Sequence, residues 1–393
     1  MKKLITQRQI MVIALGLLLV GGAYSQSAAT EKTAGQLVDV GGGRLWMESA
    51  GSGGPAVVLD YGLGGPINTW QGIFPEIAKF TRVVQYHRAG YGRSDAPWQP
   101  YNFINAATQL RTMLRLAKIP GPYVLVGHSL GNAHIRAFAH LYPEDVAGLV
   151  FIDPVNARVF ELETTDEEKA EEEQWVKGFL LRAAPGPRAE ITFLTTEDKD
   201  LDTLKTLKRP PDVPMALLVA GRHESGARWK RSVIEEYGPW IYEGSEGTLI
   251  VDAESTHYIH RDNPALVISS IRRVVFPSVS RIIGRLIKDK GVDAAVAGYR
   301  SLMERYPRDQ FVESSLNTLG YQRLREKDIK GAIALFKLNV EMFPKAANPY
   351  DSLAEAYMAD GQKDLAIRNY RRSFELDPTN TNAVEMLKKL EDK

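Results

Sequence analysis

Short apolar runs alternate with longer amphipathic stretches through residues 36–275. Each apolar run is bounded by glycine, proline or aspartate, which is typical of buried strands. These runs lie at 56–60, 83–86, 123–126, 149–152, 215–219 and 248–251. Segments with the spacing of amphipathic helices, such as 102–118 and 131–142, separate most of them. The alternation predicts an α/β fold with a largely parallel sheet covered by helices on both faces.

Two parts of this region depart from the alternation. Residues 36–48, with glycines at 41–43 in the middle, predict an antiparallel hairpin at the start of the sheet. Some 57 residues, about 155–211, separate the strand that ends at Asp153 from the next one. An insertion of that length is usually functional, so we expect a small lid there. Its acidic run at 165–174 predicts a solvated helix face.

The pattern changes at residue 276, after which the chain is predicted to be helical throughout. Similar residues recur 34 positions apart at Leu319/Leu353, Gly320/Ala354, Ala332/Ala366, Phe336/Tyr370 and Pro344/Pro378. A period of this length indicates helix pairs that bury each other's apolar faces. The pattern resembles tetratricopeptide (TPR) repeats over roughly 276–380, with a terminal helix at 381–391. That resemblance implies a surface for a protein partner. We expect a sheet domain at 26–275 and a repeat domain at 276–393.

Composition and charge narrow the function classes. The chain has 393 residues, of which 44% are hydrophobic and 25% charged, and its formal net charge is +1. A balanced charge gives no electrostatic case for nucleic acid as a partner. The sequence contains no cysteine, which excludes disulfides, thiolate metal sites and a cysteine nucleophile. His223-Glu224 has no second ligand pair at metal-site spacing, so we expect neither a metal nor a cofactor.

The first 25 residues have the three-part form of a secretory signal peptide. Lys2, Lys3 and Arg8 supply a positive region, residues 10–20 are apolar, and residues 21–25 are mostly small. The apolar core is about 15 residues, shorter than the ~20 of a spanning helix. We expect cleavage after Ser25 and a secreted or periplasmic protein. An uncleaved segment would instead anchor the chain to a membrane.

A serine between two glycines is the strongest chemical signal in the chain. Residues 127–131, GHSLG, fit the pattern G-x-S-x-G, with an apolar strand before and a helical pattern after. In that context a sharp turn presents the serine hydroxyl clear of the backbone, and flanking glycines let the turn form. A free hydroxyl is a weak nucleophile that needs a base, an orienting acid and oxyanion donors. We therefore predict Ser129 as a nucleophile.

The base and the acid are expected later in the chain. His257 lies in the loop directly after the last predicted strand, and His260 lies three residues further on. We predict His257 as the general base and His260 as a packing residue. Glu224, three residues past Gly221, is the first choice for the acid because it lies between nucleophile and base in chain order. Asp153, at the end of the preceding strand, is the alternative.

Two backbone amides are expected to stabilise the oxyanion. One is the amide of Leu130, the residue after the nucleophile. The other is that of Leu63, in the glycine-rich segment 61–65 where the chain leaves the first parallel strand. Glycines there let the backbone approach a substrate closely.

These motifs together resemble the α/β-hydrolase superfamily over residues 36–275. Four segments fall in that family's order and spacing: GLGGPINTW at 62–70, HRAGYGRSD at 87–95, GHSLG at 127–131 and THYIHRDNP at 256–264. The resemblance implies Ser129 as nucleophile, His257 as base, and Leu63 and Leu130 as oxyanion donors. Three residues depart from the family pattern. His87 and Glu224 both stand where aspartate is commoner. Asn132 replaces a frequent glycine and is expected to narrow the site.

The nucleophile sets the expected chemistry. Epoxide hydrolases and haloalkane dehalogenases of this superfamily use aspartate at that position, so a serine implies an acyl-enzyme formed from an ester, thioester or amide. We expect a secreted or periplasmic serine hydrolase that cleaves a small-molecule carboxylic ester. Two alternatives stay open. One is an aminopeptidase-type serine peptidase of the same fold, and the other is a TPR-mediated interaction protein with a non-catalytic hydrolase domain.

Overall fold

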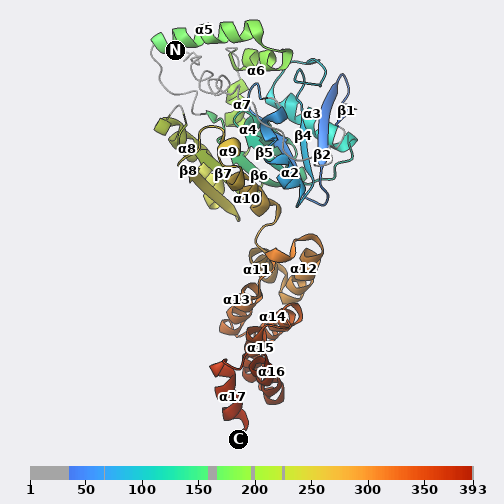
Figure 1. The fold of residues 1–393 in the computed structure, drawn as a ribbon, viewed down its shortest axis with the longest axis vertical. Helices are drawn as coiled ribbons and strands as arrows, with labels where there is room; N and C mark the ends of the chain where they lie inside the picture. Colours follow the sequence, from blue (N-terminus) through green and yellow to red (C-terminus); the bar gives the residue numbers. More distant parts are fainter. Residues whose placement is uncertain (1–34, 66, 158–165, 196–199, 224–225, 392–393) are drawn as a thin grey trace. The chain divides into compact units, whose positions relative to one another are not determined.

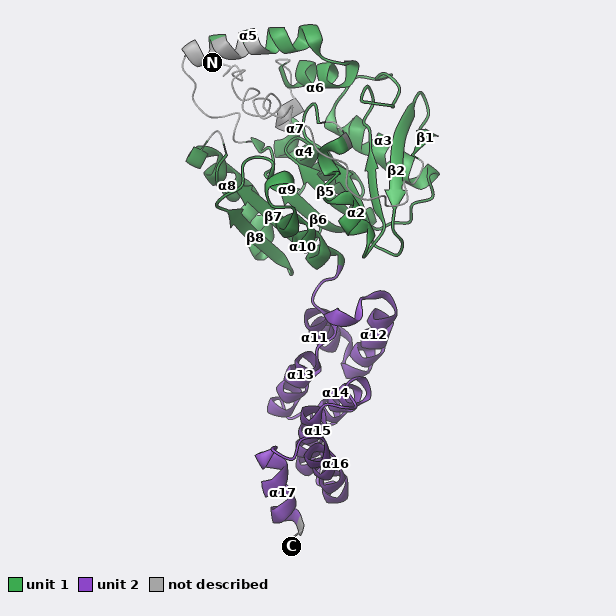
Figure 2. Ribbon diagram, in the orientation of Figure 1, with its two compact units in different colours: residues 1–275 green, residues 276–393 purple. Residues whose placement is uncertain are grey.

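The computed structural model describes residues 35–65, 67–157, 166–195, 200–223 and 226–391. The predicted signal peptide at 1–25 lies outside these ranges. The chain forms two compact units that divide between Val275 and Phe276 (Figure 2). The division falls where the sequence pattern changes from alternating strands and helices to helices alone.

The first unit is built on one eight-stranded sheet (Figure 1). Its strand order is β1-β2-β4-β3-β5-β6-β7-β8, and every pairing from β4 onward is parallel. The strands are β1 (Gln36–Asp39), β2 (Arg44–Ala50), β3 (Ala56–Asp60), β4 (Val83–Tyr86), β5 (Tyr123–His128), β6 (Val146–Ile152), β7 (Met215–Ala220) and β8 (Gly247–Asp252). The predicted antiparallel hairpin is confirmed as β1 and β2. All six predicted apolar runs form strands, and the predicted bounds of β3 and β4 are those observed.

Helices cover both faces of the sheet, which explains why its central strands are apolar throughout. Leu125 of β5 joins a core cluster with residues of α3 and α4, whereas the alternate residue Val124 faces the opposite side. On that side a Cβ added to Gly148 would lie 2.3 Å from Val274 of α10, so glycine allows the helix to approach. The helices and short 3₁₀ turns are η2 (Ile67–Trp70), α2 (Phe74–Ala78), α3 (Phe103–Leu116), α4 (Gly131–Leu141), η3 (Pro143–Asp145), α8 (Gly226–Glu243), α9 (Ile259–Asp262) and α10 (Pro264–Val275).

We call residues 155–211, the insertion between β6 and β7, the lid, and three helices lie in its described residues. The helices are α5 (Asp166–Arg182), α6 (Pro185–Thr195) and α7 (Asp200–Thr206). Gly186 of α6 donates a backbone hydrogen bond to Gly90, which follows the carboxyl end of β4 (3.0 Å). Arg136 of α4 donates to the Leu204 carbonyl of α7 (2.8 Å). Two of the lid helices are therefore tied to the sheet core.

The second unit is helical, as the sequence predicts. Consecutive helices pack in pairs, α11 on α12, α13 on α14 and α15 on α16. A Cβ added to Gly320 of α13 would lie 2.4 Å from the ring of Phe336 in α14, so the repeated small residue makes room for the repeated aromatic one. The TPR resemblance itself stays a prediction. The helices, with one 3₁₀ turn, are α11 (Val279–Lys290), α12 (Val292–Arg305), η5 (Arg308–Gln310), α13 (Glu313–Arg325), α14 (Ile329–Met342), α15 (Ala347–Ala359), α16 (Lys363–Leu376) and α17 (Thr381–Glu391).

A search of the described residues for long apolar helices finds none that could cross a membrane.

Candidate active site

Ser129 lies on a sharp turn between β5 and α4. Its φ is 51°, in the left-handed region that a serine adopts only where the surroundings impose it. Its amide donates to Ile152 (3.1 Å), and its carbonyl accepts from Val155 (3.3 Å). These two bonds fix the turn against the loop that follows β6.

The two glycines of the G-x-S-x-G pattern are required by close approaches. A Cβ added to Gly127 would lie 2.8 Å from the backbone and side chain of Asn132, and one on Gly131 would lie 2.3 Å from the carbonyl oxygen of Asp60. The side-chain amide of Asn132 donates to the carbonyl oxygens of Ser129 (3.1 Å) and Ile152 (3.2 Å), so this residue braces the turn. That Asn132 narrows the site stays a prediction.

The buried carboxylate of Asp153 lies beside His257. His257 Nδ1 and Asp153 Oδ2 are 2.7 Å apart, and Asp153 Oδ1 accepts from the amide of Ala220 (3.0 Å). An ionised carboxylate can only accept, so the proton of this bond belongs to Nδ1, and the lone pair of the imidazole is then on Nε2. That tautomer is the one a general base needs.

The structure therefore places Asp153, the alternative acid, beside the base. Asp153, directly after β6, has a positive φ of 37°, and its Oδ2 contacts His257 Nδ1. Asp153 and Glu224 both lie between Ser129 and His257 in the chain, so chain order does not decide between them. Glu224 lies outside the described residues.

Ser129 Oγ and His257 Nε2 have no hydrogen-bond partner among the described residues, although both side chains are about 2% exposed or less. Buried polar atoms are nearly always paired, because an unpaired one loses its hydration without compensation. Both atoms that the proposed chemistry would use are thus among the unpaired buried side-chain atoms of the described residues.

His128 holds the loop of the predicted base from the other side. Its Nε2 lies 2.9 Å from the carbonyl oxygen of His257, and the two rings are 4.7 Å apart. Burial, followed by the nearby His260 and His257, keeps the pKa of His128 well below its ordinary value. A neutral His128 donates to that carbonyl. The sequence analysis missed this role, and the only signal was a histidine inside an apolar strand end.

His260, assigned to packing from the sequence, is buried against aromatic rings. Its ring centre lies 4.9 Å from that of Trp70 and 4.5 Å from that of His128. Neither contact involves the carboxylate of Asp153.

The predicted oxyanion donors, Leu63 and Leu130, both belong to backbone close to Ser129. A Cβ added to Gly62 would be 3.4 Å from Ser129 Oγ, so the backbone beside Leu63 runs directly past the nucleophile. Leu130 is the N-cap residue of α4, at the end of a helix where amides lack an intrahelical acceptor. Both leucines are buried.

His223 is a second histidine beside Asp153. Its ring stacks on Trp229, with centres 4.3 Å apart, and burial lowers its pKa to about 3. The ligand atoms of Asp153, His223 and His257 all lie within 4.8 Å of one another. Zinc–ligand bonds of about 2.1 Å in tetrahedral geometry would set two ligand atoms about 3.4 Å apart. The 2.7 Å between His257 and Asp153 is that of a hydrogen bond instead.

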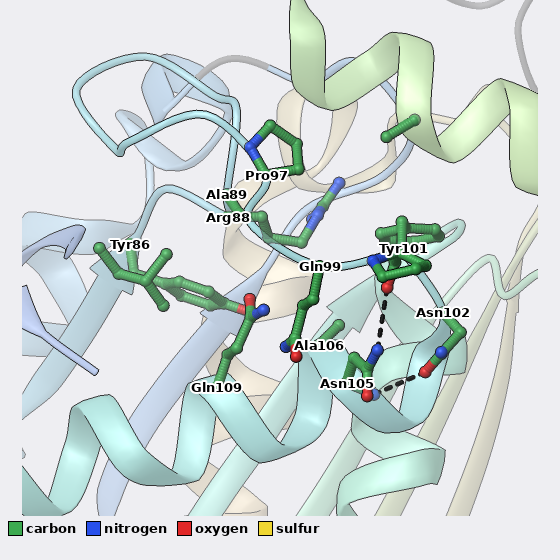
Figure 3. Close-up of a pocket in the computed structure, with 13 residues that line it drawn as sticks. Tyr86, Arg88, Ala89, Pro97, Gln99, Tyr101, Asn102, Asn105, Ala106 and Gln109 are labelled. Carbon is green, nitrogen blue, oxygen red and sulfur yellow. Dashed lines mark hydrogen bonds between the residues drawn. The ribbon is translucent and has the colours of Figure 1, made fainter. Parts of the chain in front are cut away.

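Figure 3 shows a pocket of the sheet unit. Its lining includes Arg88 and Tyr101, but not Ser129. Arg88 also reaches the glycine-rich loop: its Nη1 donates to the carbonyl of Tyr61 (2.8 Å) and its Nη2 to that of Gly62 (3.1 Å). The sequence analysis did not identify this contact.

Residues 55–268 match the model of the alpha/beta hydrolase fold family. The chain belongs to that family. An uncharacterized protein of Mycobacterium tuberculosis is 33% identical over 117 residues, covering 30% of this chain and 34% of that protein. The protein YbdG of Bacillus subtilis, also uncharacterized, is 27% identical over 194 residues, covering 45% of this chain and 58% of YbdG. The chain spans between 18% and 58% of the first five curated relatives that it matches.

Solved structures with a similar fold include hydrolases of different reactions. A thermophilic esterase from Thermogutta terrifontis has a TM-score of 0.46 at 20% identity, covering 59% of this chain and 92% of the esterase. An epoxide hydrolase from Vigna radiata has a TM-score of 0.49 at 13% identity, covering 63% of this chain and 98% of that enzyme.

Proposed function

We propose that this α/β hydrolase is a serine hydrolase that cleaves a carboxylic ester or a related acyl bond. The observation that carries the proposal is the hydrogen bond of 2.7 Å between Asp153 and His257, formed beside a serine on a left-handed turn. It gives the imidazole the tautomer of a base, and Ser129 Oγ and His257 Nε2 both lack a hydrogen-bond partner among the described residues.

In the proposed mechanism, Ser129 Oγ attacks the carbonyl carbon of the ester while its proton passes to His257 Nε2. The amides of Leu63 and Leu130 stabilise the negative charge that develops on the carbonyl oxygen. His257 then protonates the leaving alcohol as the carbon–oxygen bond breaks. Water repeats the sequence on the acyl-enzyme and releases the acid, which regenerates Ser129.

Labelling with a fluorophosphonate tests the proposal. This reagent phosphonylates activated serines, so intact mass should show one adduct on the wild type and none on Ser129→Ala. Hydrolysis of p-nitrophenyl acetate should fall roughly 10⁴-fold in that variant. Ser269→Ala, an exposed serine on α10, is the control and should behave as the wild type. A folded wild type without an adduct, or an adduct that survives in Ser129→Ala, contradicts the proposal.

A panel of acetyl esters and aminoacyl amides separates the reaction classes. We expect higher kcat/KM on the esters, because the carboxylate of Asp153 is engaged by His257, and those of Asp60 and Glu190 are engaged by Arg88, so none of the three is left to accept from a substrate amine. A free amine of an aminopeptidase substrate needs such an acceptor. Higher kcat/KM on the amides would favour the aminopeptidase alternative.

A further inference from the structure

The lid contributes a carboxylate to the protein core. Glu190 of α6 is 1% exposed, and its Oε1 accepts from Arg88 Nε at 2.7 Å. Its Oε2 accepts a hydrogen bond from the hydroxyl of Tyr91. Burial disfavours the charge of Arg88, but Glu190, Tyr61 and Asp60 outweigh it and raise its pKa well above the ordinary value. The contact is therefore a buried, charged one.

Both partners of Glu190 also hold the loop that carries the proposed oxyanion donor. Arg88 Nη2 donates to the carbonyl oxygen of Gly62 (3.1 Å), and the hydroxyl of Tyr91 accepts from the amide of Gly64 (3.0 Å). These two contacts lie on either side of Leu63, one on each of its peptide planes.

Because a peptide bond is planar, the contact between Arg88 and the Gly62 carbonyl also sets the orientation of the Leu63 N–H. The Gly62 carbonyl and the Leu63 N–H belong to one planar trans unit, in which C=O and N–H point in opposite directions. Fixing the carbonyl on Arg88 therefore fixes the direction of the Leu63 N–H. A hydrogen bond to a positive charge also polarises the peptide, which strengthens its N–H as a donor.

We propose that Glu190 is a positioning residue, through which α6 sets the Leu63 amide for oxyanion stabilisation. The oxyanion hole is then complete only when this lid helix is docked. The inference rests on the proposed function above. In this proposal the lid does more than cover the site. The carboxylate of Glu190 both holds α6 against Arg88 and orients the loop at 61–65.

The chain supplies a matched control in a second buried pair. Arg136 Nη1 lies 2.5 Å from Glu236 Oε1, and Arg136 also binds the lid helix α7 through the Leu204 carbonyl. Their side chains are 4% and 12% exposed. No contact described for this pair involves residues 61–65. Glu236→Gln therefore removes the same charge from a similar ion pair without touching the donor loop.

The test compares Glu190→Gln with Glu236→Gln in the full chain. For Glu190→Gln we expect kcat on p-nitrophenyl acetate to fall at least tenfold with KM within about threefold, since one oxyanion donor is worth about 10²–10³ in kcat. Fluorophosphonate labelling should slow similarly, and amide hydrogen exchange of peptide 61–65 should become faster. Glu236→Gln should match the wild type in all three. Equal kcat and equal exchange in the two variants would overturn the proposal.

A second variant covers the case in which Glu190→Gln does not fold. Tyr91→Phe removes the hydroxyl that joins Glu190 to Gly64 and keeps the Arg88–Glu190 pair. It should lower kcat and loosen peptide 61–65 in the same direction, and wild-type values would overturn the proposal. The exchange readout needs no catalysis. An unlabelled wild type would therefore refute the serine mechanism, whereas unchanged exchange would refute the coupling to the lid.

Discussion

Two clusters of buried polar side chains meet at the loop after β3, and they differ in how completely they are paired. In the cluster around Arg88, the side-chain atoms of Asp60, Arg88 and Glu190 that can bond all have partners. In the cluster around Ser129, the serine Oγ and His257 Nε2 have none among the described residues. Both are almost wholly buried. We expect the full pairing around Arg88 to hold the backbone in place, and the unpaired Ser129 Oγ and His257 Nε2 to be the atoms that react with a substrate.

Substitutions in the cluster around Ser129 should abolish activity with little effect on folding. In Asp153→Asn the amide can donate to His257 Nδ1, which favours the tautomer protonated on Nε2. We expect kcat to fall roughly 10³–10⁴-fold, measured on p-nitrophenyl acetate. Glu224→Gln is the control and should keep most of the activity. A larger loss in Glu224→Gln than in Asp153→Asn would assign the acid to Glu224.

Substitutions in the cluster around Arg88 should instead lower the free energy of unfolding. Arg88→Met leaves the carboxylates of Asp60 and Glu190 buried without their cation, which costs about 3–5 kcal/mol of unfolding free energy. All six tryptophans lie in residues 1–275, so tryptophan fluorescence in urea reports on this unit alone. Arg44→Met removes the exposed pair with Asp95 and should cost much less, because water already solvates both charges. Equal losses of unfolding free energy in Arg88→Met and Arg44→Met would contradict the stabilising role of the cluster around Arg88.

The same contrast separates what the sequence predicts from what it misses. Strands, the serine turn and the position of His257 are local patterns: an apolar run, a G-x-S-x-G turn, a histidine after a strand. The partners of Arg88 come from residues 28 and 102 positions away. No period or motif signals such a pair. The available hint was a charged residue, Asp60 or Arg88, directly at the end of an apolar run.

Asp153 shows an intermediate case. The sequence identifies it as one of two acids and ranks it second, because Glu224 lies three residues past the strand-ending Gly221. The structure adds a backbone φ of 37° that turns its carboxylate toward His257. Whether a residue before a proline takes such a conformation depends on the surrounding chain. Here the backbone N–H of Asp153 donates a hydrogen bond to the carbonyl oxygen of Leu218. Local sequence therefore gives the candidates, and tertiary contacts choose between them.

Acid should weaken the sheet unit through the buried histidine next to Arg88. Burial, with Arg93 as a second cause, lowers the pKa of His87 to about 4. Between the unfolded value of about 6.5 and about 4, the unfolded chain binds a proton that the folded chain excludes, so stability falls as pH falls, by up to about 1.4 kcal/mol per pH unit. In His87→Asn the side-chain oxygen can still accept from the Arg93 amide, without titrating in this range. Urea unfolding at pH 6.5 and pH 5 should show a smaller loss in this variant, and equal losses would exclude His87 as the cause.

The smallest expected effect is that of metal ions on ester hydrolysis. It tests whether the unpaired Ser129 Oγ and His257 Nε2 belong to a serine nucleophile and its base or to a metal site. Asp153, His223 and His257 are close enough to share an ion, but a zinc would have to separate His257 Nδ1 from Asp153 Oδ2 to about 3.4 Å. That separation breaks the 2.7 Å bond that holds the base in its tautomer. Dialysis against EDTA should therefore change ester hydrolysis by less than about twofold, and added Zn²⁺ should inhibit. Activity that is lost with EDTA and restored by Zn²⁺ would make these three residues ligands, and the open atoms would then belong to a metal site rather than to a serine nucleophile and its base.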